Sequence, residues 1–344
     1  MEDFIELNSD QRREIVNTRQ RFQAWQNAVQ RERSYRGSMV WGETGGELYL
    51  LRSYYDERGN RKQKSLGRKT SETEAAKTLF DTERQEAIAS RKRLDAVVER
   101  QAAINRALGL GRVPELTARI LRQLDQRGLL GRGLRVVGTN ALYAYEAACG
   151  VFLDSSLTAT EDIDLLFDAR SRLYLIADEE VPPGSLLQIL KYVDRSFRRT
   201  RQSFRAENDE GYFVDLIKPL ANPPWRGGKS KIGAADDLEA AEIEGLVWLE
   251  NAPAFEQMAI DERGVPLRIV APDPRAFAVH KYWISTRANR NPVKKRRDEQ
   301  QARAIARLLR SYLVHLSFTS DELRYLPKDV IDSAATAFAA GQER

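Results

Sequence analysis

The sequence contains little cysteine and histidine and no long apolar segment. Its single cysteine, Cys149, excludes a disulfide framework and fits a reducing cytosol. The two histidines, His280 and His315, share no metal-ligand spacing with the cysteine, so we expect no zinc site. No apolar run approaches the roughly 20 residues that span a bilayer, and the acidic segment at residues 1–14 lacks the apolar stretch of a signal peptide. We therefore expect a cytoplasmic protein without a membrane partner.

The composition is that of a soluble globular protein. Hydrophobic residues make up 42% and charged residues 31% of the 344 residues, a balance typical of a folded chain with much exposed helix. This length indicates two domains, or one core with substantial additions. The formal net charge of +5 permits a nucleic-acid partner without requiring one.

Two carboxylates stand two residues apart in an otherwise apolar segment that ends at Phe167. The segment favours a strand, in which Asp162 and Asp164 project from the same face while Ile163 points into a core. Carboxylates so close repel each other and raise each other's affinity for protons. A divalent cation removes this penalty, and oxygen ligands favour Mg²⁺ or Mn²⁺.

A glycine-containing turn precedes the carboxylate pair. Residues Leu134–Val137 favour a strand, and Gly138 and Thr139 follow it directly. The glycine lets the backbone approach a ligand closely, and a helix that begins near Asn140 directs its free amides and positive dipole end to the same place. Phosphate is the natural occupant. A phosphate site beside a metal-binding carboxylate pair is what transfer of a nucleotidyl group requires.

These motifs resemble the signature of the DNA polymerase β-like nucleotidyltransferase superfamily, in which Gly-Ser or Gly-Thr precedes Asp-x-Asp. The gap from Thr139 to Asp162 is 162 − 139 = 23 positions, longer than in the minimal members. The abortive-infection branch (type IV toxins) has a longer gap and a Gly-Gly-Thr-Ala-Leu opening, which the segment from Thr139 to Leu142 resembles. The span also resembles an uncharacterised bacterial group with the nucleotidyltransferase fold.

The resemblance implies a third carboxylate on a later strand, and Asp215 is the candidate. Segments 203–205 and 212–217 favour two strands joined by the turn at residues 208–211. Asp215 lies between the apolar residues Val214 and Leu216, so we expect it to face away from the core.

The resemblance also implies the roles of the site residues. Asp162, Asp164 and Asp215 would hold two Mg²⁺ (or Mn²⁺) ions, and Asp215 could help to deprotonate the acceptor hydroxyl. A nucleoside triphosphate would be the substrate. Its phosphates would be bound by Gly138, Thr139 and Asn140, and by a lysine of a C-terminal helical unit, for which we propose Lys281.

The resemblance and the sequence pattern together predict an α+β fold in three parts. Residues 1–112 are expected to hold a helix, a three-stranded meander and a long helix. Residues 113–271 would form the nucleotidyltransferase core, a mixed sheet with flanking helices. Residues 272–344 would form the C-terminal helical unit.

Further elements follow from periodicity, caps and turns. In the N-terminal part we expect a helix at residues 9–34, strands within residues 37–68, a capping box at 71–74 and a long helix that ends near residue 108. In the core we expect a helix at 184–193, a loop at 222–229, and strands at 246–249, 255–260 and 267–270 that extend the catalytic sheet. Two helices are expected at 275–285 and 299–316.

Three basic segments bear on a nucleic-acid partner. The meander combines aromatic and basic residues, as in small sheets that bind a nucleic-acid backbone: Trp41, Tyr49, Arg52, Tyr54, Tyr55, Arg61, Lys62, Lys64, Arg68 and Lys69. The alternative is a sheet packed on the flanking helices with a solvated charged face. The run Lys294–Arg297 adds positive charge that favours RNA over a small molecule. The segment 195–201 is either a solvated edge strand or a phosphate-binding surface.

Three functions are compatible with the sequence. The first is a metal-dependent nucleotidyltransferase that adds a nucleoside monophosphate to an RNA end such as that of tRNA, or to a protein hydroxyl, with a toxin role among the options. The second is a small-molecule nucleotidyltransferase. The third is a nucleic-acid-binding or antitoxin-like protein without catalysis, which the presence of all three carboxylates disfavours. The sequence does not identify the nucleotide, the acceptor or the oligomeric state.

Overall fold

The computed structural model describes residues 4–55, 61–168, 185–221, 231–232, 236–318 and 321–340. The chain forms two compact units. The larger comprises residues 1–8, 112–261 and 267–344, and the smaller comprises residues 9–111 and 262–266. The larger unit holds a mixed sheet with flanking helices, which confirms the predicted α+β class. The division into domains 1–112, 113–271 and 272–344 stays a prediction.

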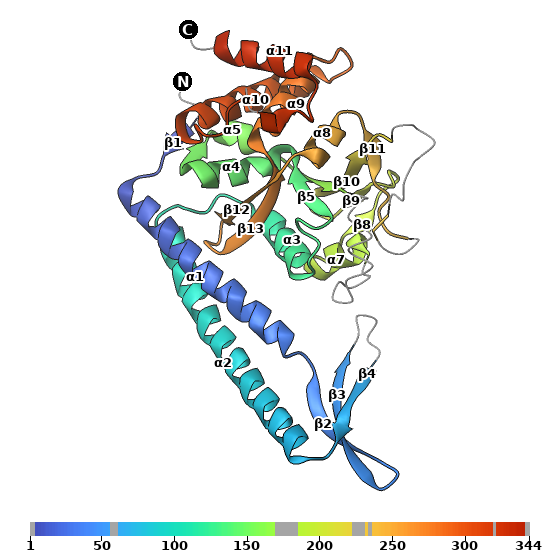
Figure 1. Ribbon diagram of the computed structural model, residues 1–344. Coiled ribbons are helices and arrows are strands. Elements are labelled where there is room, and N and C mark those ends of the chain that lie inside the picture. Colours follow the sequence, from blue (N-terminus) through green and yellow to red (C-terminus); the bar gives the residue numbers. More distant parts are fainter. Residues whose placement is uncertain are drawn as a thin grey trace. The chain divides into compact units, whose positions relative to one another are not determined.

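The smaller unit consists of two long helices and a three-stranded antiparallel sheet, as predicted (Figure 1). Helix α1 (Ser9–Ser34) packs along α2 (Ser71–Ala107) through narrow apolar stripes that include Phe22 and Ala87. The strands are β2 (Ser38–Thr44), β3 (Glu47–Tyr55) and β4 (Arg61–Arg68), paired in that order. Within the described ranges no helix is both long enough and apolar enough to cross a membrane.

The N-terminal cap of α2 lies one residue earlier than predicted. Thr70 takes the extended conformation of an N-cap residue, and its hydroxyl accepts a hydrogen bond from the Thr73 amide. The Thr73 hydroxyl in turn accepts from the Thr70 amide at 2.8 Å. In the predicted capping box at 71–74, the Glu74 side chain would accept from the amide of the N-cap residue. Thr73 does this instead, because a threonine hydroxyl can also reach the N-cap amide.

A mixed sheet forms the centre of the larger unit. Its strand order is β5-β7-β10-β9-β8, with β11 paired to β10 off this path. Strands β7 and β10 run parallel, whereas β5 and β9 lie antiparallel to them on either side. The bounds are β5 (Leu134–Val137), β7 (Asp162–Phe167), β8 (Arg198–Arg199), β9 (Arg205–Glu207), β10 (Phe213–Pro219) and β11 (Ala241–Ile243). Strand β8 ends this order and its two arginines are exposed, as expected of a solvated edge strand.

Helices and two small strand pairs surround this sheet. The helices are α3 (Glu115–Gln126), the 3-10 turn η1 (Gly138–Ala141), α4 (Leu142–Cys149), α5 (Ser155–Thr158), α7 (Leu186–Val193), α8 (Leu246–Asn251), α9 (Pro274–Thr286), α10 (Pro292–Tyr312), η4 (Asp321–Leu323) and α11 (Lys328–Ala339). Strand β1 (Phe4–Glu6) pairs with β6 (Val151–Leu153), and β12 (Ala254–Ile260) pairs with β13 (Pro266–Pro272). Burial raises the pKa of the Cys149 thiol, at the end of α4, to about 12.

One predicted element has the wrong type, and others are present but differ in sheet membership or in their bounds. The segment 246–249 belongs to helix α8 and not to a strand, since a short apolar run has no periodicity that separates the two. Strands β12 and β13 form a sheet of their own and do not extend the central sheet. The helix predicted at 299–316 begins earlier, at Pro292, where the Asn291 side chain caps it. The loop predicted at 222–229 lies outside the described residues.

An aspartate distant in sequence fixes the start of α7 against the sheet. The carboxylate of Asp237 is fully buried and accepts hydrogen bonds from the amides of Leu186 and Leu187, at 2.9 and 3.0 Å. These amides belong to the first turn of the helix, where no intrahelical acceptor exists. The contact therefore ties the segment after β10 to the helix before β8.

We expect Asp237→Ala to lower the free energy of unfolding by about 1–3 kcal/mol, because two buried amides lose their acceptor. Urea denaturation followed by circular dichroism measures this. The matched control is Glu239→Ala, two residues away with an exposed side chain. Equal stability of the two variants would contradict the capping role.

Candidate active site

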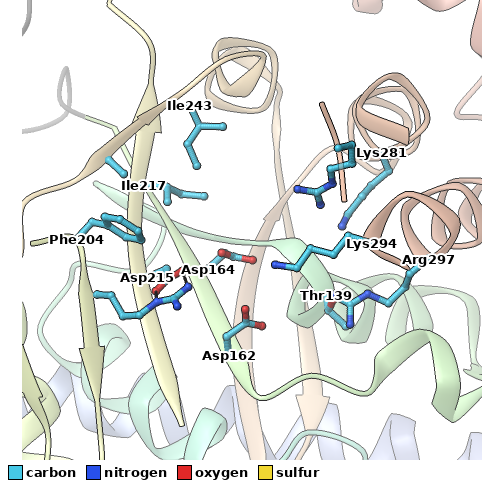
Figure 2. Close-up of a pocket in the computed structure, with 13 residues that line it drawn as sticks. Thr139, Asp162, Asp164, Phe204, Asp215, Ile217, Ile243, Lys281, Lys294 and Arg297 are labelled. Carbon is cyan, nitrogen blue, oxygen red and sulfur yellow. Dashed lines mark hydrogen bonds and ion pairs between the residues drawn. The ribbon is translucent and has the colours of Figure 1, made fainter. Parts of the chain in front are cut away.

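The central sheet brings three carboxylates together. Asp164 of β7 lies directly opposite Asp215 of β10 in the parallel register, and Asp162 lies on the same face of β7. Oxygen atoms of the three carboxylates all lie within 4.8 Å of one another. The intervening Ile163 is fully buried on the opposite face. The predicted alternation along both strands therefore produces one acidic cluster (Figure 2).

Asp164 lies at the centre of this cluster. Burial raises its pKa to about 7, and the neighbouring carboxylates of Asp162 and Asp215 act in the same direction. Lys281 and Lys294 oppose the shift. A carboxylate that keeps a proton near neutral pH lies where its negative charge is poorly stabilised. A divalent cation would stabilise that charge.

Gly138 makes room for the Asp164 carboxylate. Its φ of +64° is in the left-handed region, which favours glycine. A Cβ atom at this position would lie 2.0 Å from Oδ2 of Asp164. The sequence predicted that a ligand comes close to the Gly138 backbone. In the structure the side chain of Asp164 lies there.

Two neighbours orient Asp162. The hydroxyl of Thr160 donates to its carboxylate, and the side-chain amide of Asn140 donates to its carbonyl oxygen at 2.7 Å. Asn140 is 1% exposed, and its own Oδ1 has no partner among the described residues. Asn140 thus fixes the start of β7.

Asp215 has a direct counter-ion. Arg205 of β9 is its cross-strand neighbour and donates from Nε to Oδ1 at 2.7 Å and from Nη2 to Oδ2 at 2.6 Å. Asp215 is 6% exposed, whereas the Arg205 side chain is 27% exposed, so the pair is only partly shielded from water. Asp162 and Asp164 form no such ion pair with any described residue.

A basic wall faces the carboxylates across the cavity. It consists of the cavity-lining cations Lys281, Arg290, Lys294 and Arg297. Figure 2 shows the amino group of Lys294 pointing toward Asp164, and Lys281 directed into the same space. The four residues come from α9, from α10 and from the segment between them.

A buried aspartate holds half of the basic wall in place. Asp298 is 1% exposed and accepts from Lys281 Nζ at 2.7 Å and from Arg290 Nε at 2.8 Å. Lys294 lies four residues before Asp298 on α10, and Arg297 lies directly before it. Within the described part of the chain neither forms an ion pair with Asp298, so their charges remain directed at the cavity.

Apart from Arg205, the rest of the cavity lining is neutral. Thr139 is 4% exposed, and its hydroxyl accepts a bond of 3.3 Å from the amide of Gln301 on α10. At another end lie the apolar side chains of Phe204, Ile217 and Ile243, as Figure 2 shows. The cavity thus has an acidic floor, a basic wall and an apolar end.

The predicted site residues divide into two groups. Thr139, Asp162, Asp164, Asp215 and Lys281 line one cavity. Gly138 contacts the Asp164 carboxylate, and Asn140 donates to the Asp162 carbonyl oxygen. Their role as phosphate ligands stays a prediction.

The sequence pattern does not assign Arg205, Arg290 or Gln301 to the site. It indicates the run Lys294–Arg297 only as a surface for RNA. The helical spacing of this run is a signal that points further, because Lys294 and Arg297 are three residues apart and so share one helix face.

The raised pKa of Asp164 predicts a pH effect on the metal-free protein. Between its ordinary value of 3.8 and about 7, the folded protein binds a proton that the unfolded chain does not, so stability falls as pH rises through this range. Asp164→Asn should remove this loss, so its stability relative to the wild type should rise by roughly 2–3 kcal/mol from pH 5 to pH 8.

Denaturant titrations in EDTA at the two pH values measure this difference. The exposed Asp329→Asn serves as the control, and its stability relative to the wild type should change little between them. A stability difference between Asp164→Asn and the wild type that is the same at both pH values would contradict the shift.

The contact between Gly138 and Asp164 can be isolated with a second glycine. Gly138→Ala and Gly150→Ala both force alanine into a left-handed conformation, at φ of 64° and 65°, which costs roughly 1–2 kcal/mol each. Only at Gly138 does the new Cβ meet another side chain. We expect Gly138→Ala to be less stable than Gly150→Ala by at least about 1 kcal/mol, measured by urea denaturation. Equal losses would mean that Asp164 moves aside freely.

Comparison with known proteins agrees with this geometry. A family model described as a nucleotidyltransferase matches residues 115–326, which is more than half of the 344 residues. The matched segment contains the three carboxylates, Arg205 and the basic wall. Searches of curated proteins and of solved structures gave no match. The chain therefore belongs to this nucleotidyltransferase family.

Proposed function

We propose that this nucleotidyltransferase moves a nucleoside monophosphate from a nucleoside triphosphate to an acceptor hydroxyl and depends on a divalent cation. The observation that carries the proposal is the pairing of an acidic cluster with a basic wall in one cavity. The carboxylates on one side are complementary to a divalent cation, and the lysines and arginines on the other side are complementary to phosphate groups. Together the two sides are complementary to a metal-bound triphosphate. An enzyme that catalyses this reaction would be of the EC 2.7.7 type.

The donor set fits Mg²⁺ or Mn²⁺. Asp162, Asp164 and Asp215 offer only carboxylate oxygens, which such cations prefer over the nitrogen and sulfur ligands that suit zinc or copper. When bound there, the cation would stabilise charge on the transferred phosphate and make the acceptor hydroxyl more acidic. The raised pKa of Asp164 supports the fit, because a cation would replace its proton.

The remaining residues would bind and orient the nucleotide. Lys294 and Arg297 are the best candidates for phosphate ligands, since neither has a carboxylate partner among the described residues. Lys281, the lysine predicted for this role, is 7% exposed and paired with Asp298. It would therefore attract the phosphates through its charge without a direct contact. Asp215 would accept the proton of the attacking hydroxyl.

The apolar end of the cavity suits a nucleoside. Phe204 offers an aromatic ring, and Ile217 and Ile243 offer aliphatic surface. Stacking on an aromatic ring does not discriminate strongly between bases. Which triphosphate is used, ATP included, is therefore left to the transfer assay.

RNA is the acceptor we favour. Strand β4 of the smaller unit exposes Arg61, Lys62, Lys64 and Arg68, which supports binding to a phosphate backbone. Part of the predicted surface is used for packing, since the Arg52 guanidinium lies over the Phe80 ring at 4.2 Å. Lys294 and Arg297 face the cavity, so only part of that run remains for RNA. The toxin role rests on the resemblance of the Thr139–Leu142 opening alone.

The transfer reaction should require the carboxylates. We expect the double variant Asp162→Asn, Asp164→Asn to lose at least about 100-fold in transfer, because the cation site loses two of three charged ligands. The assay incubates the protein with each α-labelled nucleoside triphosphate, Mg²⁺ and total bacterial RNA, and then follows label in RNA and in protein bands. Asp329→Asn, an exposed change of the same kind, is the control.

The outcomes separate the alternatives. Label in RNA supports the favoured acceptor, and label only in protein points to nucleotidylation of a protein hydroxyl. No label, with Mg²⁺-dependent nucleotide binding retained, favours a small-molecule acceptor. Full activity of the double variant, or a protein that binds no Mg²⁺ nucleotide, would overturn the proposal and favour a non-catalytic nucleic-acid-binding protein.

A further inference from the structure

One member of the acidic cluster is already neutralised by the protein itself. Arg205 lies opposite Asp215 in the β9–β10 register and engages both of its carboxylate oxygens, at 2.7 and 2.6 Å. This two-bonded geometry is the strongest form of arginine–carboxylate pair. It occupies the same oxygens that a cation shared with Asp162 and Asp164 would use.

Arg205 is held in position by two aromatic rings. Its guanidinium carbon lies 4.7 Å from the centre of the Phe213 ring and 5.7 Å from that of Phe204. These contacts restrict a side chain that would otherwise have many rotamers. The pair is therefore a built feature of the cavity wall and not a chance surface contact.

The charges of the cluster explain why the pair persists. The hydrogen bonds that Arg205 donates to Asp215 are the main cause that raises the pKa of Arg205, and the negative charges of Asp215, Asp162 and Asp164 act in the same direction. An arginine guanidinium is not deprotonated in proteins, so Arg205 keeps its charge. It can leave Asp215 only by moving, and not by losing its proton.

We propose that Arg205 is an internal counter-ion that competes with the divalent cation for Asp215, and that the nucleotide relieves this competition. The inference rests on the proposed metal-dependent function. Arg205 lines the cavity, so the phosphates of a bound substrate would offer its guanidinium another anionic partner. Arg205 is then a positioning residue that couples cation binding to substrate binding.

Coupling of this kind has a thermodynamic signature. The cation binds weakly while Arg205 holds Asp215, and it binds more tightly once the nucleotide draws the guanidinium away. By linkage, the cation must raise the affinity for the nucleotide by the same factor. Free metal would then be bound poorly unless substrate is present.

Mn²⁺ titrations without any turnover test the proposal. Binding is followed by the electron paramagnetic resonance signal of free Mn²⁺, for the wild type, Arg205→Ala, Arg205→Lys and Arg198→Ala. We expect Arg205→Ala to bind Mn²⁺ about tenfold more tightly than the wild type. In the variant no arginine–Asp215 pair has to be broken before the cation can bind. Arg205→Lys should lie between them. Arg198→Ala, which removes an exposed arginine from the neighbouring strand, should behave as the wild type.

A second titration measures the coupling. In the presence of a non-hydrolysable triphosphate analogue, the Mn²⁺ affinity of the wild type should rise by a larger factor than that of Arg205→Ala. Thermal melts show whether each variant is folded, and Arg205→Lys keeps the test available if Arg205→Ala is not. The Asp162→Asn, Asp164→Asn variant identifies binding at the cluster by its loss.

Unchanged or weaker Mn²⁺ binding by folded Arg205→Ala would overturn the inference and leave the proposed function intact. An equal effect of the analogue on both proteins would overturn the coupling. Failure of the wild type to bind Mn²⁺ at the cluster even in the presence of the triphosphate analogue would instead overturn the proposed function, and the inference with it. The two failures are therefore distinguishable.

Discussion

The parallel pairing of β7 with β10 forces three carboxylates into one small volume. Asp164 and Asp215 are direct neighbours in this register, and Asp162 is two residues away on the same strand as Asp164. Carboxylates within 4.8 Å repel one another, and partial burial increases the cost. The surrounding structure is arranged around this concentration of negative charge. Burial raises the pKa of Asp164, and the charges of Asp162 and Asp215 raise it further.

The protein meets this charge in two ways. Arg205 neutralises Asp215 by direct contact, whereas Lys281 and Lys294 act on Asp164 through space. Asp298 holds Lys281 by a buried contact and Arg290 by a partly exposed one. The cavity therefore has acidic and basic sides that face each other, and this pairing underlies the proposed function.

The local elements of the site could be predicted from the sequence. Alternation of Asp162 and Asp164 with Ile163 required strand β7, and the glycine at 138 marked the turn before α4. The turn at 208–211 predicted the hairpin that carries Asp215, although its first strand is Arg205–Glu207 and not 203–205. Each of these follows from neighbouring residues alone. The assignment of Asp215 as third ligand needed the family resemblance.

What could not be predicted depends on contacts between distant segments. The Arg205–Asp215 pair requires one particular hairpin register, which the pattern does not give, and Asp298 meets Lys281 only after α9 and α10 pack together. The apolar run 246–249 is too short to show whether it is strand or helix, and here the left-handed Gly245 begins α8. The asparagine cap at 291 extends α10 back over the basic run, and this turns Lys294 and Arg297 toward the cavity.

The position of a bound cation tests the proposed metal site most directly. Crystals grown with Mn²⁺ and a non-hydrolysable nucleoside triphosphate analogue would give an anomalous difference map that locates Mn²⁺ without reference to activity. We predict a peak in contact with Asp162, Asp164 and Asp215, with the phosphates near Lys294 and Arg297. A well-ordered triphosphate elsewhere in the protein, with no peak at the three carboxylates, would contradict this assignment.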